Sequence, residues 1–223
     1  MIRQKVKKPA ISEEILEDVQ RESFAYFMHE ANPKNGLVAD CTRPGSPASI
    51  AAVGLALSSY PVGVEKGFIT RFAGRKRTLA TLRFFRDSVQ STAPDATGYK
   101  GFYYHFLEMK TGRRAWKCEL STIDTAFLIA GMLTAAAYFS ADQRDEREIR
   151  QVADELYRRV DWQWAQNGKP TVTHGWKPGR GFLKYRWQGY DEALFLYLLG
   201  LGSPTHPLPT ESFDQWVVTY KWC

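Results

Sequence analysis

Four carboxylates stand at the predicted starts of two apolar helices, and they are the residues of this chain best suited to catalyse a reaction. Glu119 and Asp124 flank the start of one apolar segment, and Asp191 and Glu192 open another. Free backbone N–H groups and the helix dipole stabilise a carboxylate in the first turn of a helix. Hydrolysis of a glycosidic bond needs two carboxyl groups, one protonated and one ionised. We predict Glu192 as general acid and Asp124 or Glu119 as the base that activates water.

The same carboxylates also have a structural interpretation. Ser121 is a candidate N-cap, and Glu119 and Asp124 would then serve only to cap the helix that follows. Asp191 and Glu192 could equally be partners of the helix dipole. We interpret Asp191 as structural and Glu192 as functional, because an apolar helix would desolvate the Glu192 carboxyl and an aromatic cleft raises a carboxyl pKa.

Aromatic side chains are more abundant than a core of this size requires. They make up 14% of the chain, with 7 Trp and 11 Tyr, and they gather in segments 89–120 and 165–189. Sugar rings offer apolar CH faces for stacking and hydroxyls for hydrogen bonds, and they need no basic pocket. The candidate sugar-binding aromatics in and beside these segments are Tyr99, Phe102, Tyr104, Trp176, Tyr185, Trp187 and Tyr190.

Other kinds of site are not predicted. His105 and His206 have no partner at metal-ligand spacing, and we expect His29 and His174 at the surface. The chain contains neither GxxxxGK nor GxGxxG, and its serines and cysteines lie in no nucleophile motif. We therefore expect no metal site and no nucleotide binding.

Composition also limits the partners and the compartment. The net charge of +6 is mild, and bases alternate with acids in 142–159, so we expect solubility rather than nucleic-acid binding. The three cysteines share no metal-like spacing and indicate free thiols. No stretch approaches the roughly 20 apolar residues of a membrane span, and residues 1–10 lack a signal-peptide core. We expect residues 1–10 to be basic and disordered. We expect the protein to be cytoplasmic, or periplasmic if a signal has been removed.

Helical periodicity marks the elements that must position these residues. The apolar segments are 47–60, 121–138 and 190–201. The amphipathic segments are 12–30, 69–88, 144–164 and one that begins near 211. Amphipathic and apolar segments alternate along the chain. The alternation predicts a single all-α domain in which an inner ring of apolar helices is wrapped by an outer ring.

The connections predict where a site would lie. Segments that lead into apolar helices are long, whereas those that leave them are short. All long connections must therefore lie at one end, over the amino termini of the inner helices, where function usually concentrates. No regular strand pair is evident in them, although GFYYHFLEM could form a short hairpin arm.

Five strings, in order, resemble the bacterial glycoamylase-like family of glucoamylase relatives, which is related to endo-β-1,2-glucanases and to a domain of cyclic β-1,2-glucan synthases. They are NGLVAD, PGSPASIAAVGLALSSYPVGVEKGFITR, DATGYKGFYYHFLEMKTGRRAWKCELSTIDTAFLIAG, YRRVDWQWA and WQGYDEALFLYLLGLGSPTHPLP. The resemblance implies an (α/α)6 barrel, a glucan substrate and no cofactor. It implies Glu119, Asp124 and Glu192 as the acidic site. It also implies sugar subsites lined by Tyr99, Lys100, Tyr104, His105 and Trp187.

The chain departs from the family pattern in two respects. Ala39 and Cys41 stand where the family usually carries a charged residue and an arginine. The family barrel has six helix pairs, whereas this chain carries three and the start of a fourth outer helix. We expect a truncated half barrel whose exposed apolar sides, at 47–60 and 190–201, favour self-association. Two hypotheses follow: a glycoside hydrolase acting on β-linked glucan, with β-1,2 linkage favoured, or an inactive remnant that at most binds glucan.

Overall fold

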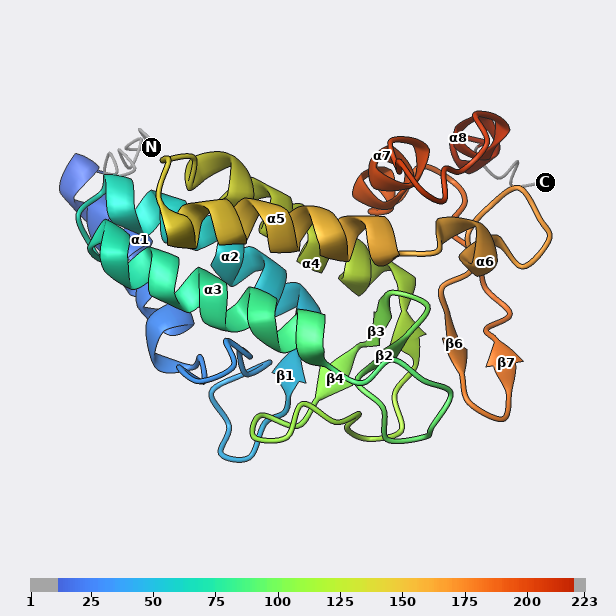
Figure 1. Cartoon of the computed structure of the whole chain (residues 1–223), viewed down its shortest axis with the longest axis horizontal. Coiled ribbons are helices and arrows are strands. Elements are labelled where there is room, and N and C mark those ends of the chain that lie inside the picture. Colours follow the sequence, from blue (N-terminus) through green and yellow to red (C-terminus); the bar gives the residue numbers. More distant parts are fainter. Residues whose placement is uncertain (1–11, 219–223) are drawn as a thin grey trace, which may run out of the picture.

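Two layers of helices form most of the computed structural model, which describes residues 12–218 (Figure 1). The inner helices are α2 (Ile50–Glu65), α4 (Thr122–Tyr138) and α7 (Leu194–Leu201). The outer helices are α1 (Glu13–His29), α3 (Arg71–Asp87), α5 (Arg144–Arg159) and α8 (Glu211–Trp216). The predicted disorder of residues 1–10 lies outside the described residues.

Packing between the helices follows the predicted alternation. The inner helix α4 packs against both α2 and α7, while α3 and α5 pack on each other and cover α2 and α4. Figure 1 shows α3 and α5 in front of the two inner helices. Within 12–218, no helix is long and apolar enough to cross a membrane. The two-layer arrangement of apolar inner and amphipathic outer helices is confirmed.

Two glycines allow the inner helices to approach each other at backbone distance. A Cβ built on Gly54 would lie 2.3 Å from the carbonyl oxygen of Phe127, and one on Gly131 would lie 2.1 Å from that of Gly54. Real side-chain carbons do not approach backbone so closely. The α2–α4 contact therefore depends on the absence of side chains at these positions.

Three predicted boundaries differ from the structure. Helix α2 continues past residue 60, through Pro61, to Glu65. The predicted 144–164 helix breaks, because Val160 is extended and the Asp161 carboxylate accepts the Trp164 N–H at 3.0 Å to cap a separate α6 (Trp162–Gln166). Helix α7 begins at Leu194, four residues later than predicted, since tertiary contacts hold the preceding residues in a turn.

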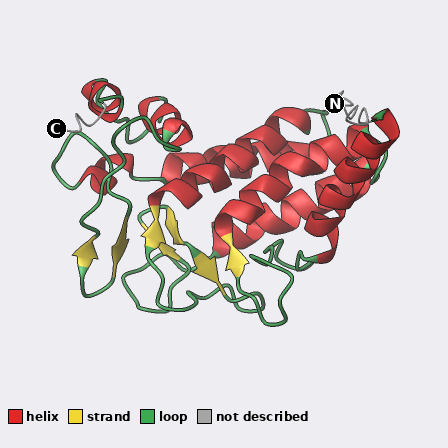
Figure 2. Ribbon diagram, turned by 180° about the vertical axis from the view of Figure 1, so that it is seen from behind, coloured by secondary structure: helices red, strands yellow, loops and turns green. Residues whose placement is uncertain are grey.

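The prediction of an all-α fold is wrong, because the long connections form two small antiparallel sheets. One sheet pairs β1 (Ala48–Ser49) with β4 (Phe106–Leu107). The other has the order β2 (Gly98–Tyr99), β3 (Phe102–Tyr104), β5 (Leu120–Ser121), β6 (Gly175–Lys177), β7 (Gly181–Phe182). Figure 2 shows these strands along one side of the helical layers. The predicted hairpin arm in GFYYHFLEM is confirmed for β3, which pairs with β2 across a tight turn, whereas β4 of the same segment pairs with β1 in the other sheet.

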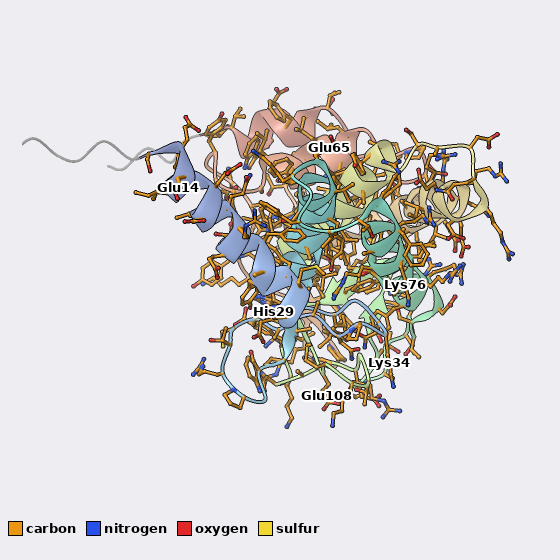
Figure 3. All side chains as sticks on the ribbon, turned by 90° about the vertical axis from the view of Figure 1, so that its left-hand side faces the viewer. Glu14, His29, Lys34, Glu65, Lys76 and Glu108 are labelled. Carbon is orange, nitrogen blue, oxygen red and sulfur yellow. The ribbon has the colours of Figure 1, made fainter. Side chains whose placement is uncertain are left out.

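The sheets lie at the end of the inner helices that the sequence predicted for the long connections. Strand β1 leads directly into α2, and β5 leads directly into α4. In Figure 3, Glu65 at the end of α2 lies on the far side of the molecule from the loop residue Glu108. The long connections therefore gather over the amino termini of α2 and α4.

Apolar side chains remain exposed on two inner helices. Leu55 of α2 is 52% exposed, and Phe195 and Leu198 of α7 are 48% and 54% exposed. The Phe195 ring lies 5.8 Å from the Phe127 ring of α4, so the exposed side of α7 adjoins α4. The predicted exposure on both helices is confirmed for these side chains.

Candidate active site

The start of α4 fixes the first candidate carboxyl. Ser121 is the last residue of β5 and the N-cap of α4. Its Oγ accepts the backbone N–H of Asp124 at 3.2 Å and donates to Asp124 Oδ2 at 2.5 Å. The capping role of Ser121 is confirmed. The cap also immobilises the Asp124 carboxyl, so the structural and functional interpretations of this motif are compatible.

His105 lies between the two candidate carboxyls. Its Nδ1 is 3.0 Å from Glu119 Oε1, and its Nε2 is 3.6 Å from Asp124 Oδ2. The ring stacks on Phe106 with centroids 3.9 Å apart. Its backbone N–H donates to the Glu119 carbonyl at 3.0 Å, and its carbonyl accepts the N–H of Ile50 at 3.2 Å. Both sides of the imidazole thus contact acidic side chains, and the His105 backbone joins the residue before β5 to the start of α2.

The three groups titrate away from their usual values. The hydrogen bond from His105 lowers the pKa of Glu119 to about 2. Burial raises the pKa of Asp124, and this outweighs the charge of His105 and the Ser121 hydrogen bond. Burial alone would lower the pKa of His105, but the Glu119 hydrogen bond and the nearby acidic charges raise it overall. Glu119 is therefore the carboxyl that stays ionised, and Asp124 is the one that retains a proton to higher pH.

A cavity of about 270 Å³ brings the predicted catalytic residues together. All three predicted carboxylates line it, together with His105 and Trp187. The remaining lining residues are Ser121, Ile123, His174 and Leu183. Most of the lining residues lie in or next to strands β3, β5, β6 and β7 of the five-stranded sheet, which joins segments that are far apart in the sequence.

His174 is a cavity residue that the sequence did not predict. It was expected at the surface, but its ring stacks on Trp187 with centroids 3.9 Å apart, and burial lowers its pKa. The Trp187 indole N–H donates to Thr122 Oγ1 at 3.0 Å, which anchors the stack to α4. The pairing of β5 with β6 places Gly175, the next residue, opposite Ser121. No local sequence pattern reveals that pairing.

The two carboxylates before α7 have separate environments. Asp191 accepts the indole N–H of Trp216 at 2.8 Å and the backbone N–H of Ala193 at 3.1 Å, in keeping with a structural role. Glu192 lines the cavity but is exposed and precedes the helix. The expectation that an apolar helix desolvates Glu192 is therefore wrong, because α7 starts beyond it.

Several predicted sugar-binding aromatics lie outside the cavity, in a cluster around Trp164. The rings of Tyr99 and Phe102 are 5.5 and 5.9 Å from the Trp164 ring. Trp176 lies 5.4 Å from Tyr99. Phe102 is fully buried, so we withdraw it as a sugar contact.

Lys100 and Tyr104 do not line the cavity either. Lys100 Nζ lies 3.3 Å from Asp161 Oδ2, at the cap of α6. The Tyr104 ring is fully buried, and the Arg114 guanidinium carbon lies over it, 4.5 Å from the ring centroid. A direct sugar contact by Tyr104 therefore requires a rearrangement of Arg114.

The last two predicted aromatics are exposed. Tyr185 lies beside the cavity, with its ring 6.1 Å from that of His174. Tyr190 stacks on Trp216 at 5.2 Å and does not line the cavity. Of these two, Tyr185 is the better placed to touch a ligand in the cavity.

Known proteins share this fold. A putative glucoamylase from Bacteroides uniformis is 28% identical, with a TM-score of 0.84, over 95% of this chain and 52% of its own. An endo-β-1,2-glucanase from Chitinophaga pinensis, solved with sophorotriose and glucose, is 26% identical, with a TM-score of 0.82, over 93% of this chain and 51% of its own. The described helices and short strands match about half of these chains, which are glucanase-type helical barrels.

Comparisons of the sequence point to the same group of proteins as the solved structures. The family model described as "Putative glucoamylase" matches residues 184–223. An exo-β-1,2-glucooligosaccharide sophorohydrolase acting at the non-reducing end, from Parabacteroides distasonis, is 28% identical over 215 residues, which is 92% of this chain. The resemblance to the glycoamylase-like family and to β-1,2-glucanases is confirmed. The chain spans 29% of the length of this curated relative and about half of the solved structures.

Proposed function

We propose that this chain is a glycoside hydrolase acting on β-1,2-linked glucan, and that the 270 Å³ cavity is its catalytic site. One observation carries the proposal: two carboxyl groups with opposite pKa shifts lie on either side of one imidazole. A glycosidase needs such a pair, since one carboxyl must donate a proton while the other remains ionised. The substrate class is supported by the β-1,2-glucan relatives.

The pKa directions support roles for each group. Asp124, whose pKa is raised by burial, is the general acid that protonates the leaving oxygen. Glu119, held ionised by His105, is the base that activates water. Trp187, stacked on His174, borders the same space and offers an aromatic edge to a sugar ring. Glu192 as general acid stays the alternative assignment, with its exposed carboxyl at the same cavity.

Leaving-group chemistry separates the two candidate acids. A general acid matters little when the leaving group is a good one such as nitrophenolate, because that group departs without a proton. Asp124→Asn should therefore lose cleavage of β-1,2-gluco-oligosaccharides but keep most cleavage of a 4-nitrophenyl β-sophoroside. Glu119→Gln should lose both. If Glu192→Gln instead loses oligosaccharide cleavage but keeps cleavage of the 4-nitrophenyl substrate, Glu192 is the acid.

The overall proposal is tested by reducing-sugar release from β-1,2-, β-1,3- and α-glucans. We expect release from the β-1,2-glucan alone and its loss in Glu119→Gln. Asp154→Asn is the matched control, since Asp154 is an exposed carboxylate of α5 paired with Arg158. Oligosaccharide binding without cleavage by the unaltered chain would favour the alternative, a glucan-binding protein without hydrolytic activity.

The exposed apolar side chains support a separate proposal about assembly, in which a second copy packs on α2 and α7. Apart from Glu65, neither helix carries a charged residue, so the same face of another copy meets no charge repulsion. Leu198→Glu should shift the species measured by light scattering toward the monomer. Phe72→Glu, on the outer α3, should not. A monomeric unaltered chain refutes the proposal.

A further inference from the structure

Trp116 is held in an unusual conformation outside the catalytic cavity. Its side chain is 68% exposed, although the indole is among the largest apolar groups in the protein. Its φ is 52° and that of Lys117 is 53°, so two successive residues other than glycine occupy the left-handed region. Such strain persists only where surrounding contacts impose it, and it concentrates at functional positions.

Arg114 supplies those contacts. Its Nε donates to the Cys118 carbonyl at 2.6 Å, and its Nη2 donates to the Lys117 carbonyl at 2.7 Å. The guanidinium also lies 4.5 Å from the centre of the buried Tyr104 ring. The planar, five-donor group thus clamps the strained turn onto the core, which a lysine could not reproduce.

A short series of rings connects Trp116 to the catalytic residues. The Trp116 ring lies 5.1 Å from Phe106, and Phe106 stacks on His105 at 3.9 Å. Trp116 also lines two open grooves. The first has a volume of about 710 Å³ and includes Arg43 and Glu108. In Figure 3, Glu108 and His29, which both line this groove, lie toward the loop end of the molecule.

The second groove lies on the side of the β6–β7 turn. Its volume is about 560 Å³, and Lys177 and Arg180 line it together with Asp95. The first groove mixes acidic with basic side chains, whereas the second carries Arg114, Lys117, Lys177 and Arg180 against one acid, Asp95. The first groove is therefore the one that suits an uncharged ligand. Trp116 is shared by the two grooves and therefore forms a ridge between them.

We propose that Trp116 is a stacking platform for a glucosyl ring of the substrate beyond the catalytic cavity, with Arg114 as its positioning residue. This rests on the proposed function, because the chain that reaches Trp116 is the one cleaved beside His105. The catalytic cavity, at about 270 Å³, lies below the usual 300–1,000 Å³ of ligand sites, so further sugar rings must lie outside it. The exposed indole offers the apolar face that a pyranose ring stacks on, and Arg43 and Glu108 line the same groove, where they offer polar groups to sugar hydroxyls.

The test measures binding as a function of chain length in the Glu119→Gln chain, which is expected not to cleave. The probes are the β-1,2-linked disaccharide and pentasaccharide, measured by calorimetry. Trp116→Ala should weaken pentasaccharide binding about twofold to tenfold, the range of one aromatic stacking contact, and leave the disaccharide unchanged. Trp116→Tyr should restore most of the loss. Phe72→Ala removes an equally exposed aromatic from the outer α3 and should change neither.

Arg114→Lys tests the positioning role. It should weaken the pentasaccharide while disaccharide binding persists, which shows that the fold and the cavity are intact. Equal pentasaccharide affinity in Trp116→Ala and its parent overturns this inference and leaves the proposed function standing. Equal weakening of both probes also overturns it, because Trp116 would then act on the cavity itself. Failure of the unaltered chain to bind either probe overturns the proposed function and this inference together.

Discussion

The charge-assisted hydrogen bond from His105 is the largest cause of the low pKa of Glu119, and His105→Gln weakens this bond. Glutamine keeps a hydrogen-bond donor near Glu119 but never carries the positive charge. Because a neutral donor bonds a carboxylate less strongly than a charged one, the pKa of Glu119 should rise part of the way from about 2 toward its usual 4.5. Asp124 is also relieved of a favourable charge, so its pKa should rise further above normal.

The magnitude follows from the same shift. Each pKa unit corresponds to about 1.4 kcal/mol, so the full change at Glu119 is worth about 3 kcal/mol. The side chains of His105 and Glu119 are 30% and 26% exposed, and water screens part of their interaction. We therefore expect His105→Gln to reduce the free energy of unfolding by about 1–2 kcal/mol where both groups are charged.

The two pKa shifts define the pH range in which Glu119 and His105 are both charged. The lowered pKa of Glu119 contributes stability that is present above 4.5 and lost as the pH falls toward 2. The raised pKa of His105 contributes stability that is fully present below 6.5 and lost as the pH rises through its folded-state value. The difference in unfolding free energy between the unaltered chain and His105→Gln should therefore be largest between pH 4.5 and 6.5.

Urea unfolding at a series of pH values measures the stability difference, and carboxyl ¹³C NMR measures the Glu119 titration. Gln163→Ala is a control, since Gln163 is a polar residue of α6 whose side chain bonds the Pro207 carbonyl away from the cavity. A Glu119 that titrates near 2 in His105→Gln would refute the reasoning, as would a stability difference independent of pH.

Two further predictions concern the helical layers. Gly131→Ala would place a Cβ about 2.1 Å from the Gly54 carbonyl oxygen, so we expect a loss of about 3 kcal/mol in urea unfolding. Arg71→Met removes the Nε and Nη2 bonds, at 2.9 and 2.7 Å, to the fully buried Glu146 carboxylate, and a loss of about 3 kcal/mol should appear in the same assay. The more exposed pair formed by Arg83 provides the comparison, because Arg83→Met should lose less than about 1 kcal/mol.

The helical layers could be predicted because their signals are local. Helices α2, α4 and α7 are nearly free of charge, and their outer neighbours carry charges on one side, so periodicity alone identified the layers. Ser121 as the cap of α4 was equally visible, since its side chain and the N–H it accepts are three residues apart. Such features need no knowledge of distant contacts.

The strands could not be predicted because they are too short for a pattern. Each has two or three residues, which is less than one clear alternation of apolar and polar positions. Their stability comes from partners distant in the sequence, such as Ser121 of β5 opposite Gly175 of β6. The same reason explains why His174 was missed and why the expected desolvation of Glu192 was wrong. Pairing brings His174 into the cavity, and the bond from Trp216 to Asp191 delays the start of α7.

The candidate site rests directly on the contact between the two central helices. His105 receives a backbone hydrogen bond from Ile50 at the start of α2, while Glu119 lies just before α4. We therefore expect a shift of α2 against α4 to change the distance between the side chains of His105 and Glu119. Gly131→Ala should accordingly raise the pKa of Glu119 as well as reduce stability. Arg71→Met, with a similar loss of stability in the outer layer, should leave the Glu119 titration near 2. Equal effects of the two variants on that titration, followed by ¹³C NMR, would show that the site does not depend on the α2–α4 contact.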